Sequence, residues 1–425
     1  VDPTNGVVES SESDNTYPIS GAAATMDVRT LPSFDVRLVP VTQSVNGTTG
    51  AVNAGNAGAY LSASLAMFPI GASNIDVRAA YTTNAPVLQA DDNNGAWGQV
   101  LSELNALRTA DGSTRYYAGI ARVNYTSGIA GLGYVPGRAT LSWDYLPSAS
   151  EVVAHELGHN FGRFHAPCGG AGNPDPSFPH SGGSIGHYGY SLTSASLKAP
   201  SMADLMGYCS NIWISDYTYN AVLNYRTTNG FSGSARVLGG NPNPRRGLLV
   251  WGRVQRGQLI LEPAFEVNAP PALPERAGPY RLEAFGPAGE SVLDLSFDVQ
   301  VPGDSPDPTA RHFAFVIPAD MLRDLDLSRL RVSGNGRQAE RRASTAVRQA
   351  ASSPTVEREG RGLRVRGADN SVSGVLVRDA RTGDILSFAR GTTALVVTNG
   401  TELDITESDG VRSQTRRVRV APGRR

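Results

Sequence analysis

The sequence is short of several kinds of residue, and each shortage excludes a class of protein. It has two cysteines among 425 residues, too few for a small scaffold held together by many disulfides. No run approaches the roughly 20 consecutive apolar residues of a membrane-spanning helix, so we expect no membrane span. The formal net charge is −1, so no overall basic field favours nucleic acid or an anionic membrane.

Lysine is scarcer still, with Lys198 standing against 37 arginines, a bias that we associate with a GC-rich bacterial genome. Aromatic residues make up 7% of the chain, whereas 47 glycines and 27 prolines predict many turns and short strands. The chain is 40% hydrophobic and 18% charged, which favours ordinary globular cores over disorder. At roughly 150 residues per domain, the length predicts two to four domains.

Strand and helix patterns alternate in the first half of the chain. Residues 1–27 are polar with little periodicity, and we expect a flexible lead-in. Apolar periodicity predicts strands at 28–41, 74–81, 116–123, 129–135 and 139–143, helices at 59–68 and 97–108, and a loop at 46–58. This alternation favours a domain over 28–235 that layers helices on a mixed sheet.

After residue 235 helical patterns become scarce. Short β-rich runs follow one another at 247–254, 258–262, 280–285, 312–317, 362–366, 374–378 and 393–398, separated by turn residues. We predict two all-β, sandwich-like domains at 240–340 and 354–425. The polar and basic stretch 335–353 is expected to be the linker between them.

Three of the six histidines lie in one short segment, SASEVVAHELGHNFGRFHAPC. His155 and His159 are four residues apart, so on a helix their side chains project from one face. Two neutral imidazoles on adjacent turns can share a metal ion, and zinc suits them well. Glu156 lies beside the first histidine, where it can stay off the metal and take a proton from metal-bound water.

The ends of this predicted helix place a third histidine. Ser148 and Glu151 match a capping box, which predicts a helix start at about Ala149. Gly162 lies where the helix must stop, because glycine tolerates the left-handed conformation that turns the chain. The turn would bring His165 back as a third ligand, and three protein ligands leave an open position, as in a catalytic zinc site.

A catalytic zinc site explains these histidines better than either coincidence or a purely structural metal site does. A chance match to H-E-x-x-H-x-x-G-x-x-H has a frequency of roughly one in 10⁵ for a chain of this composition, which argues against unrelated polar residues on a surface helix. A purely structural zinc site would want a fourth cysteine or histidine ligand.

The remaining polar clusters have less specific patterns. His180 and His187 lie in a Gly/Pro-rich loop that we expect to shape a rim. A second metal site and the lining of a substrate cleft are the alternatives. The acidic turn 91–95 precedes the helix predicted at 97–108 and offers N-cap residues. A calcium ion bound there is the unsupported alternative. His312 stands alone in a β run and is expected to be structural.

In this spacing the sequence resembles the metzincin clan of zinc endopeptidases over about residues 28–230. The match consists of His155, Glu156, His159, Gly162 and His165. The resemblance implies an α+β catalytic domain with a mixed twisted sheet and an active-site helix. In that clan a tight turn carrying a methionine lies beneath the metal, and Met206 fits that role.

The resemblance also implies a role for a tyrosine near the metal. Tyr208 is similar to the tyrosine of astacin- and serralysin-like members, where it would donate a hydrogen bond to the oxyanion or act as a loose extra ligand. A buried tyrosine beside the turn is the alternative. The stretches GIAGLGYV and WISDYTYN are similar to a secreted bacterial branch, the mucin-cleaving StcE-like peptidases.

The two cysteines lie close to these features. Cys168 is three residues past His165 and Cys209 is three past Met206, so a disulfide would tie the metal loop to the methionine turn. Two reduced buried thiols are the alternative. Closing a loop of about 40 residues would restrict the unfolded chain by roughly 4 kcal/mol in the entropy model. A disulfide implies an oxidising compartment, and we therefore expect a secreted protein.

The resemblance and the motif together predict a secreted, monomeric zinc endopeptidase with Glu156 as general base. Its substrates would be proteins, glycoproteins such as mucins among them. A substrate strand would pair with an exposed strand edge near 128–135. The rival hypothesis is an adhesion or glycan-binding protein whose zinc domain is structural or inactive. The intact Glu156 argues against that rival, because an inactive metal domain has no use for a general base.

Overall fold

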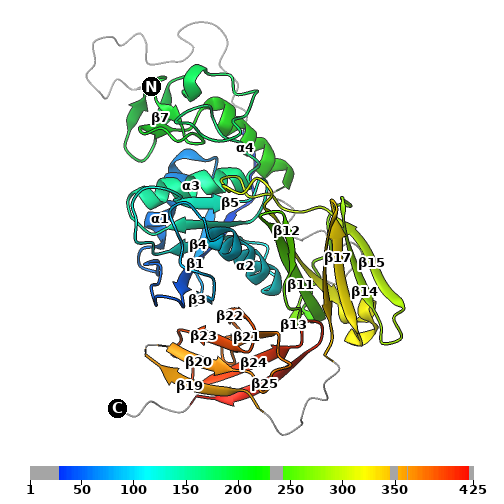
Figure 1. The fold of residues 1–425 in the computed structure, drawn as a ribbon. Helices are drawn as coiled ribbons and strands as arrows, with labels where there is room; N and C mark the ends of the chain where they lie inside the picture. Colours follow the sequence, from blue (N-terminus) through cyan, green and yellow to red (C-terminus); the bar gives the residue numbers. More distant parts are fainter. Residues whose placement is uncertain (1–27, 230–242, 345–352, 361, 421–425) are drawn as a thin grey trace, which may run out of the picture.

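The computed structural model describes residues 28–229, 243–344, 353–360 and 362–420, so the lead-in expected at 1–27 lies outside the described residues. Figure 1 shows the α-helices gathered in the first part of the chain and two all-β parts after it. The architecture is mixed α+β, with antiparallel sheets throughout the second half. Among the described residues no helix is long and apolar enough to cross a membrane.

A six-stranded sheet of mixed direction forms the base of the first part. Its order is β2-β1-β4-β6-β5, with β3 pairing the far end of β1. The strands are β1 (Phe34–Gln43), β2 (Ser73–Val77), β3 (Tyr81–Thr83), β4 (Tyr116–Ala121), β5 (Gly131–Gly133) and β6 (Ala139–Trp143). Strand β4 is buried along its whole length, as expected of a parallel strand covered on both faces. Only β5 runs antiparallel, and it ends the sheet.

Helices cover both faces of this sheet. They are α1 (Ala57–Met67), α2 (Ala96–Ala110), α3 (Ser148–Asn160) and α4 (Asp216–Asn229). Helices α1 and α3 share one buried apolar cluster with β1 and β4, whereas α2 packs in another on the opposite face. The predicted stripe of α2, which includes Trp97, Leu101 and Leu104, is fully buried. The expected helices are therefore confirmed here, with α1 starting at Ala57 inside the loop expected at 46–58. The first strand begins at Phe34 rather than Val28, and the single strand expected at 74–81 is instead the two strands β2 and β3.

Helix α3 starts where the sequence predicts, but the expected capping box is wrong. Pro147 is the N-cap residue, and no side chain caps the helix. The Ser148 hydroxyl instead donates backwards to the carbonyl of Tyr145 at 2.8 Å, so it does not serve the amides of the first turn. At the other end Gly162 has a φ of +79°, the left-handed conformation expected of the residue that turns the chain.

The segment between α3 and α4 forms a small lobe, drawn in green above α3 in Figure 1. It contains the 3₁₀ turn η1 (Ser181–Gly183) and the short strands β7 (Gly189–Ser191), β8 (Ser196–Lys198), β9 (Ala203–Asp204) and β10 (Ile212–Trp213). The disulfide predicted between Cys168 and Cys209 is present, with their Cα atoms 5.7 Å apart, and it holds this lobe together.

The second part of the molecule runs from β11 to β18, residues 245–342, and consists of two antiparallel sheets. One has the order β12-β11-β13, with β16 also pairing β11, and the other has the order β15-β14-β17-β18. One apolar cluster draws its residues from both sheets. The elements are β11 (Arg245–Gln255), β12 (Gln258–Leu261), β13 (Phe265–Ala269), β14 (Tyr280–Phe285), β15 (Ser291–Phe297), β16 (Arg311–Pro318), η2 (Ala319–Leu325), β17 (Arg329–Gly334) and β18 (Arg337–Arg342).

Strand β18 lies inside the stretch expected to be a linker, so that expectation is wrong for its first half; residues 345–352 lie outside the described part. The overlooked signal is Asn335-Gly336. Both residues have positive φ, 48° and 73°, as the two-residue hairpin turn between β17 and β18 requires.

The third part of the molecule runs from β19 to β25 and again consists of two antiparallel sheets around one apolar cluster. Its strands are β19 (Thr355–Glu359), β20 (Gly362–Arg366), β21 (Gly374–Asp379), β22 (Ile385–Arg390), β23 (Thr393–Val396), β24 (Glu402–Ser408) and β25 (Ser413–Arg419).

All three parts share a core. The cluster under α2 includes Trp251 and Phe265 from the second part and Phe388 from the third. Glu262, almost fully buried, forms ion pairs with both Arg253 and Arg390, which joins the second and third parts. This shared packing fixes the second part against the sheet of the first. It thereby brings the loop between β15 and β16 to the outer edge of β5.

Candidate metal centre

The three predicted histidine ligands come together as the motif requires. His155 and His159 project from α3, and His165 returns to them after the turn at Gly162. Their ring centroids lie 4.8 to 5.4 Å apart, and all three side chains are buried.

The outer nitrogen of each ring is held by a backbone carbonyl. Nδ1 of His155 lies 2.8 Å from the oxygen of Leu205, and Nδ1 of His159 lies 2.6 Å from that of Arg163. His165 is paired in the same way with Gly172. Because a carbonyl only accepts, each Nδ1 carries the proton, and each Nε2 presents a lone pair to the centre.

A fourth group, which sequence reasoning missed, lies where these lone pairs converge. Asp304 belongs to the loop between β15 and β16, and its side chain is 8% exposed. Its Oδ2 lies 3.0 Å from Nε2 of His159 and 3.5 Å from Nε2 of His155, and its Oδ1 lies 2.6 Å from Nε2 of His165. The expectation of an open fourth position is therefore wrong for this arrangement. No local pattern marks Asp304, because only the docking of the second part brings it here.

The donor set fits a metal cation. The Nε2 atoms of His159 and His165 are 3.2 Å apart, and Nε2 of His155 is buried without a hydrogen-bond partner. Facing lone pairs beside a carboxylate repel one another unless a positive charge lies among them. Three imidazole nitrogens and one carboxylate oxygen, all within 4.8 Å of one another, are a ligand set that zinc accepts in proteins.

Glu156 lies beside this centre, under the edge strand. It is 3% exposed, and its Oε2 is buried with no partner. Burial raises the pKa of its carboxyl well above the ordinary value, and the negative charge of Asp304 raises it further. The space for the Glu156 side chain exists because Gly131 has none, since a Cβ there would lie 2.5 Å from Oε1. A Cβ at Gly133 would lie 2.7 Å from the backbone oxygen of Glu156, so this glycine lets the edge strand approach the helix backbone.

The predicted methionine turn lies beneath the histidines. Met206 is fully buried, and a Cβ at Gly158 of α3 would lie 2.3 Å from its Sδ, so the turn packs directly on the helix backbone. The same turn supplies the carbonyl of Leu205 to His155, and the carbonyl of Met206 accepts from the amide of Ala166 at 3.0 Å. The turn thus holds the ring of His155 and the backbone next to His165.

Tyr208 faces the centre, but its hydroxyl is already engaged. The ring centroid is 5.0 Å from that of His165, and the hydroxyl donates to Oδ1 of Asp304. The side chain is half exposed rather than buried. Both burial and Asp304 raise the pKa of the phenol, which keeps it a hydrogen-bond donor.

A second group of metal-compatible side chains lies at the rim. Nε2 of His180 is 2.7 Å from Oδ1 of Asp216, and Nε2 of His187 is 3.6 Å from its Oδ2. His187 and Asp216 are largely exposed, and none of these atoms is buried without a partner. The hydrogen bond between His180 and Asp216 and the looser contact of His187 with the same carboxylate account for this group.

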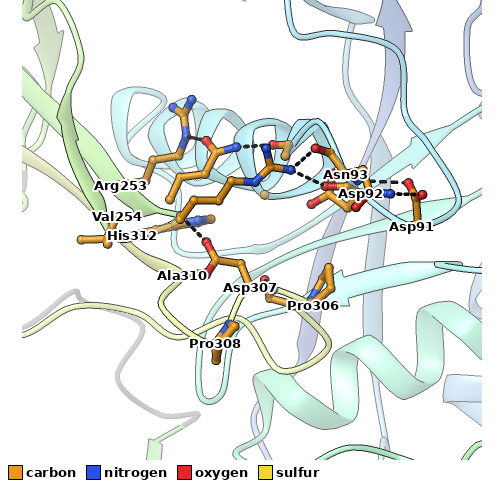
Figure 2. A pocket seen from close by; sticks show the side chains of 15 residues that line it. Asp91, Asp92, Asn93, Arg253, Val254, Pro306, Asp307, Pro308, Ala310 and His312 are labelled. Carbon is orange, nitrogen blue, oxygen red and sulfur yellow. Dashed lines mark hydrogen bonds between the residues drawn. The ribbon is translucent and has the colours of Figure 1, made fainter.

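The acidic turn 91–95 behaves as a helix cap. Asp92 accepts from the amide of Trp97 at 2.9 Å and Asn94 from that of Ala96 at 3.1 Å. Figure 2 shows this turn on one side of a cavity of about 240 Å³, with Arg253 of β11 and the loop around Asp307 across from it. None of the three histidine ligands lines this cavity, so it is separate from the candidate metal centre.

Comparisons with known proteins find only weak likenesses. No family model and no curated protein matches the chain. A metalloproteinase-II from Bacteroides fragilis aligns at 12% identity over 46% of this chain and 53% of its own, with a TM-score of 0.27. A structure described as a chaperone-substrate complex aligns at 13% identity over 48% of this chain and 35% of its own, also at 0.27. The chain thus spans about half of the first and a third of the second, and neither likeness assigns a family.

Proposed function

We propose that this protein is a secreted zinc endopeptidase of the metzincin kind. The observation that carries the proposal is the convergence of three imidazole lone pairs with Glu156 beside them. A zinc ion bound there supplies a Lewis acid that lowers the pKa of water and polarises a carbonyl. The disulfide between Cys168 and Cys209 supports an oxidising, extracellular setting.

The chain's own residues supply proton transfer and charge stabilisation. A cation at the centre would favour the ionised form of Glu156 and so offset the burial and the Asp304 charge that raise its pKa. Oε2, which has no competing partner, could then accept a proton from the attacking water and pass it to the leaving amine. The ring of Tyr208 lies beside His165, and once its hydroxyl is released from Asp304 it could donate a hydrogen bond to the oxyanion. Met206 and the carbonyls that hold each Nδ1 keep the histidine rings in place.

The edge of β5 suits an extended peptide. The carbonyl of Gly133 and the amide of Val135 form backbone hydrogen bonds with the loop between β15 and β16, and a substrate strand that replaced this loop could use the same two groups. Main-chain pairing of this kind tolerates many side chains, which fits a protease that acts on proteins and glycoproteins.

A structural metal site in an adhesion or glycan-binding protein is the second candidate, and Asp304 favours it. Closed four-ligand zinc sites are the structural kind. Against this candidate stands Glu156, because leaving its carboxylate buried beside a closed site without a hydrogen-bond partner costs stability.

The test is hydrolysis of casein and mucin by zinc-loaded protein, run in the natural chain and in Asp304→Ala. Glu156→Gln is then introduced into whichever of these two proteins cleaves the substrates. This variant should retain zinc and lose hydrolysis by several orders of magnitude. Glu151→Gln, an exposed acid on the same helix, is the matched control and should change nothing. Absence of chelator-sensitive cleavage in both backgrounds, or full activity with Gln at 156, would refute the endopeptidase.

A further inference from the structure

We propose that residues 301–304, which we call the blocking segment, are a built-in inhibitor that holds this protein in a latent form. The inference rests on the proposed function and names the regulation of the same site. The segment fills the edge on which a substrate strand would pair and closes the metal centre with Asp304. Activity then requires the segment to leave.

The blocking segment pairs with the sheet as a peptide would. The amide of Val135 donates to the carbonyl of Val301 at 2.9 Å, and the amide of Gly303 donates to that of Gly133 at 2.7 Å. Tyr134 and Pro302 form an antiparallel bridge between these two bonds. The strand edge that the sequence led us to expect as exposed is thus covered by another part of the same chain, in the manner of β-strand addition.

The segment then runs directly over the histidines. A Cβ at Gly303 would lie 2.9 Å from Nε2 of His159, so only a glycine lets the backbone pass this close. The next residue, Asp304, turns its carboxylate into the point where the Nε2 atoms meet. Because a carboxylate rather than a peptide carbonyl faces the centre, the segment presents no electrophilic carbon there and would not be cleaved as a substrate.

One side chain engages several of the groups that hydrolysis needs. The carboxylate of Asp304 contacts Nε2 of all three histidines and accepts the hydroxyl of Tyr208. In this arrangement Asp304 takes the position at which a water or a substrate carbonyl would meet the three Nε2 atoms, and the one hydroxyl proton of Tyr208 is already donated to Asp304.

Both ends of the segment are anchored in the second part of the molecule. Gln300 exchanges two main-chain hydrogen bonds with His312 of β16, and its side chain accepts from Asn105 of α2 at 2.7 Å. Beyond the segment, Asp307, labelled in Figure 2, accepts from the amide of Arg256. It also accepts from the amide of Thr309 at 2.9 Å. Because the second part shares a core with the first, the segment competes with substrate at a high effective concentration.

The first experiment compares full-length, zinc-loaded protein with Asp304→Ala, using casein hydrolysis and acetohydroxamate binding by calorimetry. We expect Asp304→Ala to raise kcat/KM at least tenfold and to bind acetohydroxamate at least tenfold more tightly. Asp320→Ala is the matched control, since Asp320 belongs to the same part, is largely exposed and forms its ion pair with Arg245. It should behave like the natural chain.

Asp304→Ala could fail to fold, so a second variant releases the blocking segment only after the protein has folded. A recognition sequence for a specific protease is inserted after Pro306, which is exposed, and the folded protein is then cut. We expect cutting to increase both readouts, whereas cutting the same insert in the exposed turn 287–289 should not.

The outcomes separate this inference from the proposed function. Tighter acetohydroxamate binding without any casein cleavage would keep the blocking segment and refute the endopeptidase. Full cleavage by the natural chain, with no gain in either variant, would keep the endopeptidase and refute the blocking segment. Loss of zinc on changing Asp304, with no gain after cutting, would show that Asp304 is a structural ligand and overturn the inference.

Discussion

Acid should weaken this fold through one buried histidine that lies far from the metal ligands in sequence. His312 on β16 is 1% exposed, and its Nδ1 lies 2.7 Å from the hydroxyl of Tyr134. Burial, reinforced by the positive charge of Arg253, lowers the pKa of His312 from 6.5 to about 3. The folded protein therefore keeps this ring neutral at pH values where the unfolded chain protonates it.

The sign and size of the effect follow from proton linkage. Above pH 6.5 both states are neutral at this position, and His312 gives no pH dependence. Between pH 6.5 and about 3 only the unfolded state takes up the proton. The free energy of unfolding therefore decreases by about 1.4 kcal/mol for each unit by which the pH is lowered. At pH 4.5, two units below the unfolded pKa, the loss is roughly 3 kcal/mol.

Urea unfolding at pH 7 and pH 4.5 measures this loss, with His312→Asn as the comparison. The amide group of asparagine can donate to or accept from the Tyr134 hydroxyl but does not titrate. The carboxylates common to both proteins contribute alike. The natural chain should lose roughly 3 kcal/mol more than the variant on acidification. Equal losses in the two proteins would refute the argument that His312 is buried and neutral.

Two further changes test the support of the metal centre. Gly158→Ala places a methyl group 2.3 Å from Sδ of Met206, and we expect a loss of about 1–3 kcal/mol in denaturant unfolding and weaker zinc binding. Gly71→Ala, which meets open space, is its control, and equal stability of the two variants would argue against close packing of the turn. Replacing Cys168 and Cys209 by serine should cost up to about 4 kcal/mol. An unchanged midpoint would mean that the disulfide does not constrain the unfolded chain.

The parts of this structure that the sequence predicted are those set by local spacing. His155 and His159 meet because they are one helical turn apart, and His165 joins them because Gly162 adopts a left-handed conformation. Asp304 could not be found in this way. Its position depends on a core shared between α2 and the second part, and no periodicity encodes such docking.

Two errors within the reach of sequence reasoning have simple causes. The Asn335-Gly336 pair is a strong hairpin signal, but the charged residues around it suggested a linker. The match of Ser148 and Glu151 to a capping box was misleading because Pro147 takes the N-cap position and the serine hydroxyl turns back to Tyr145. In the first case the charged residues concealed the turn formed by Asn335 and Gly336. In the second case the serine and glutamate pattern concealed the effect of Pro147.

The edge strand gives the strongest argument that the closed centre is a latent catalytic site. Gly131 lies in β5 although glycine weakens a strand, and a side chain at this position would collide with the side chain of Glu156. The carboxyl group that Gly131 accommodates is itself buried with an unpartnered oxygen, which also costs stability. A structural zinc site needs neither feature, since its four ligands are already complete without Glu156. Both costs make sense in a site where Glu156 must reach a water molecule once Asp304 has left.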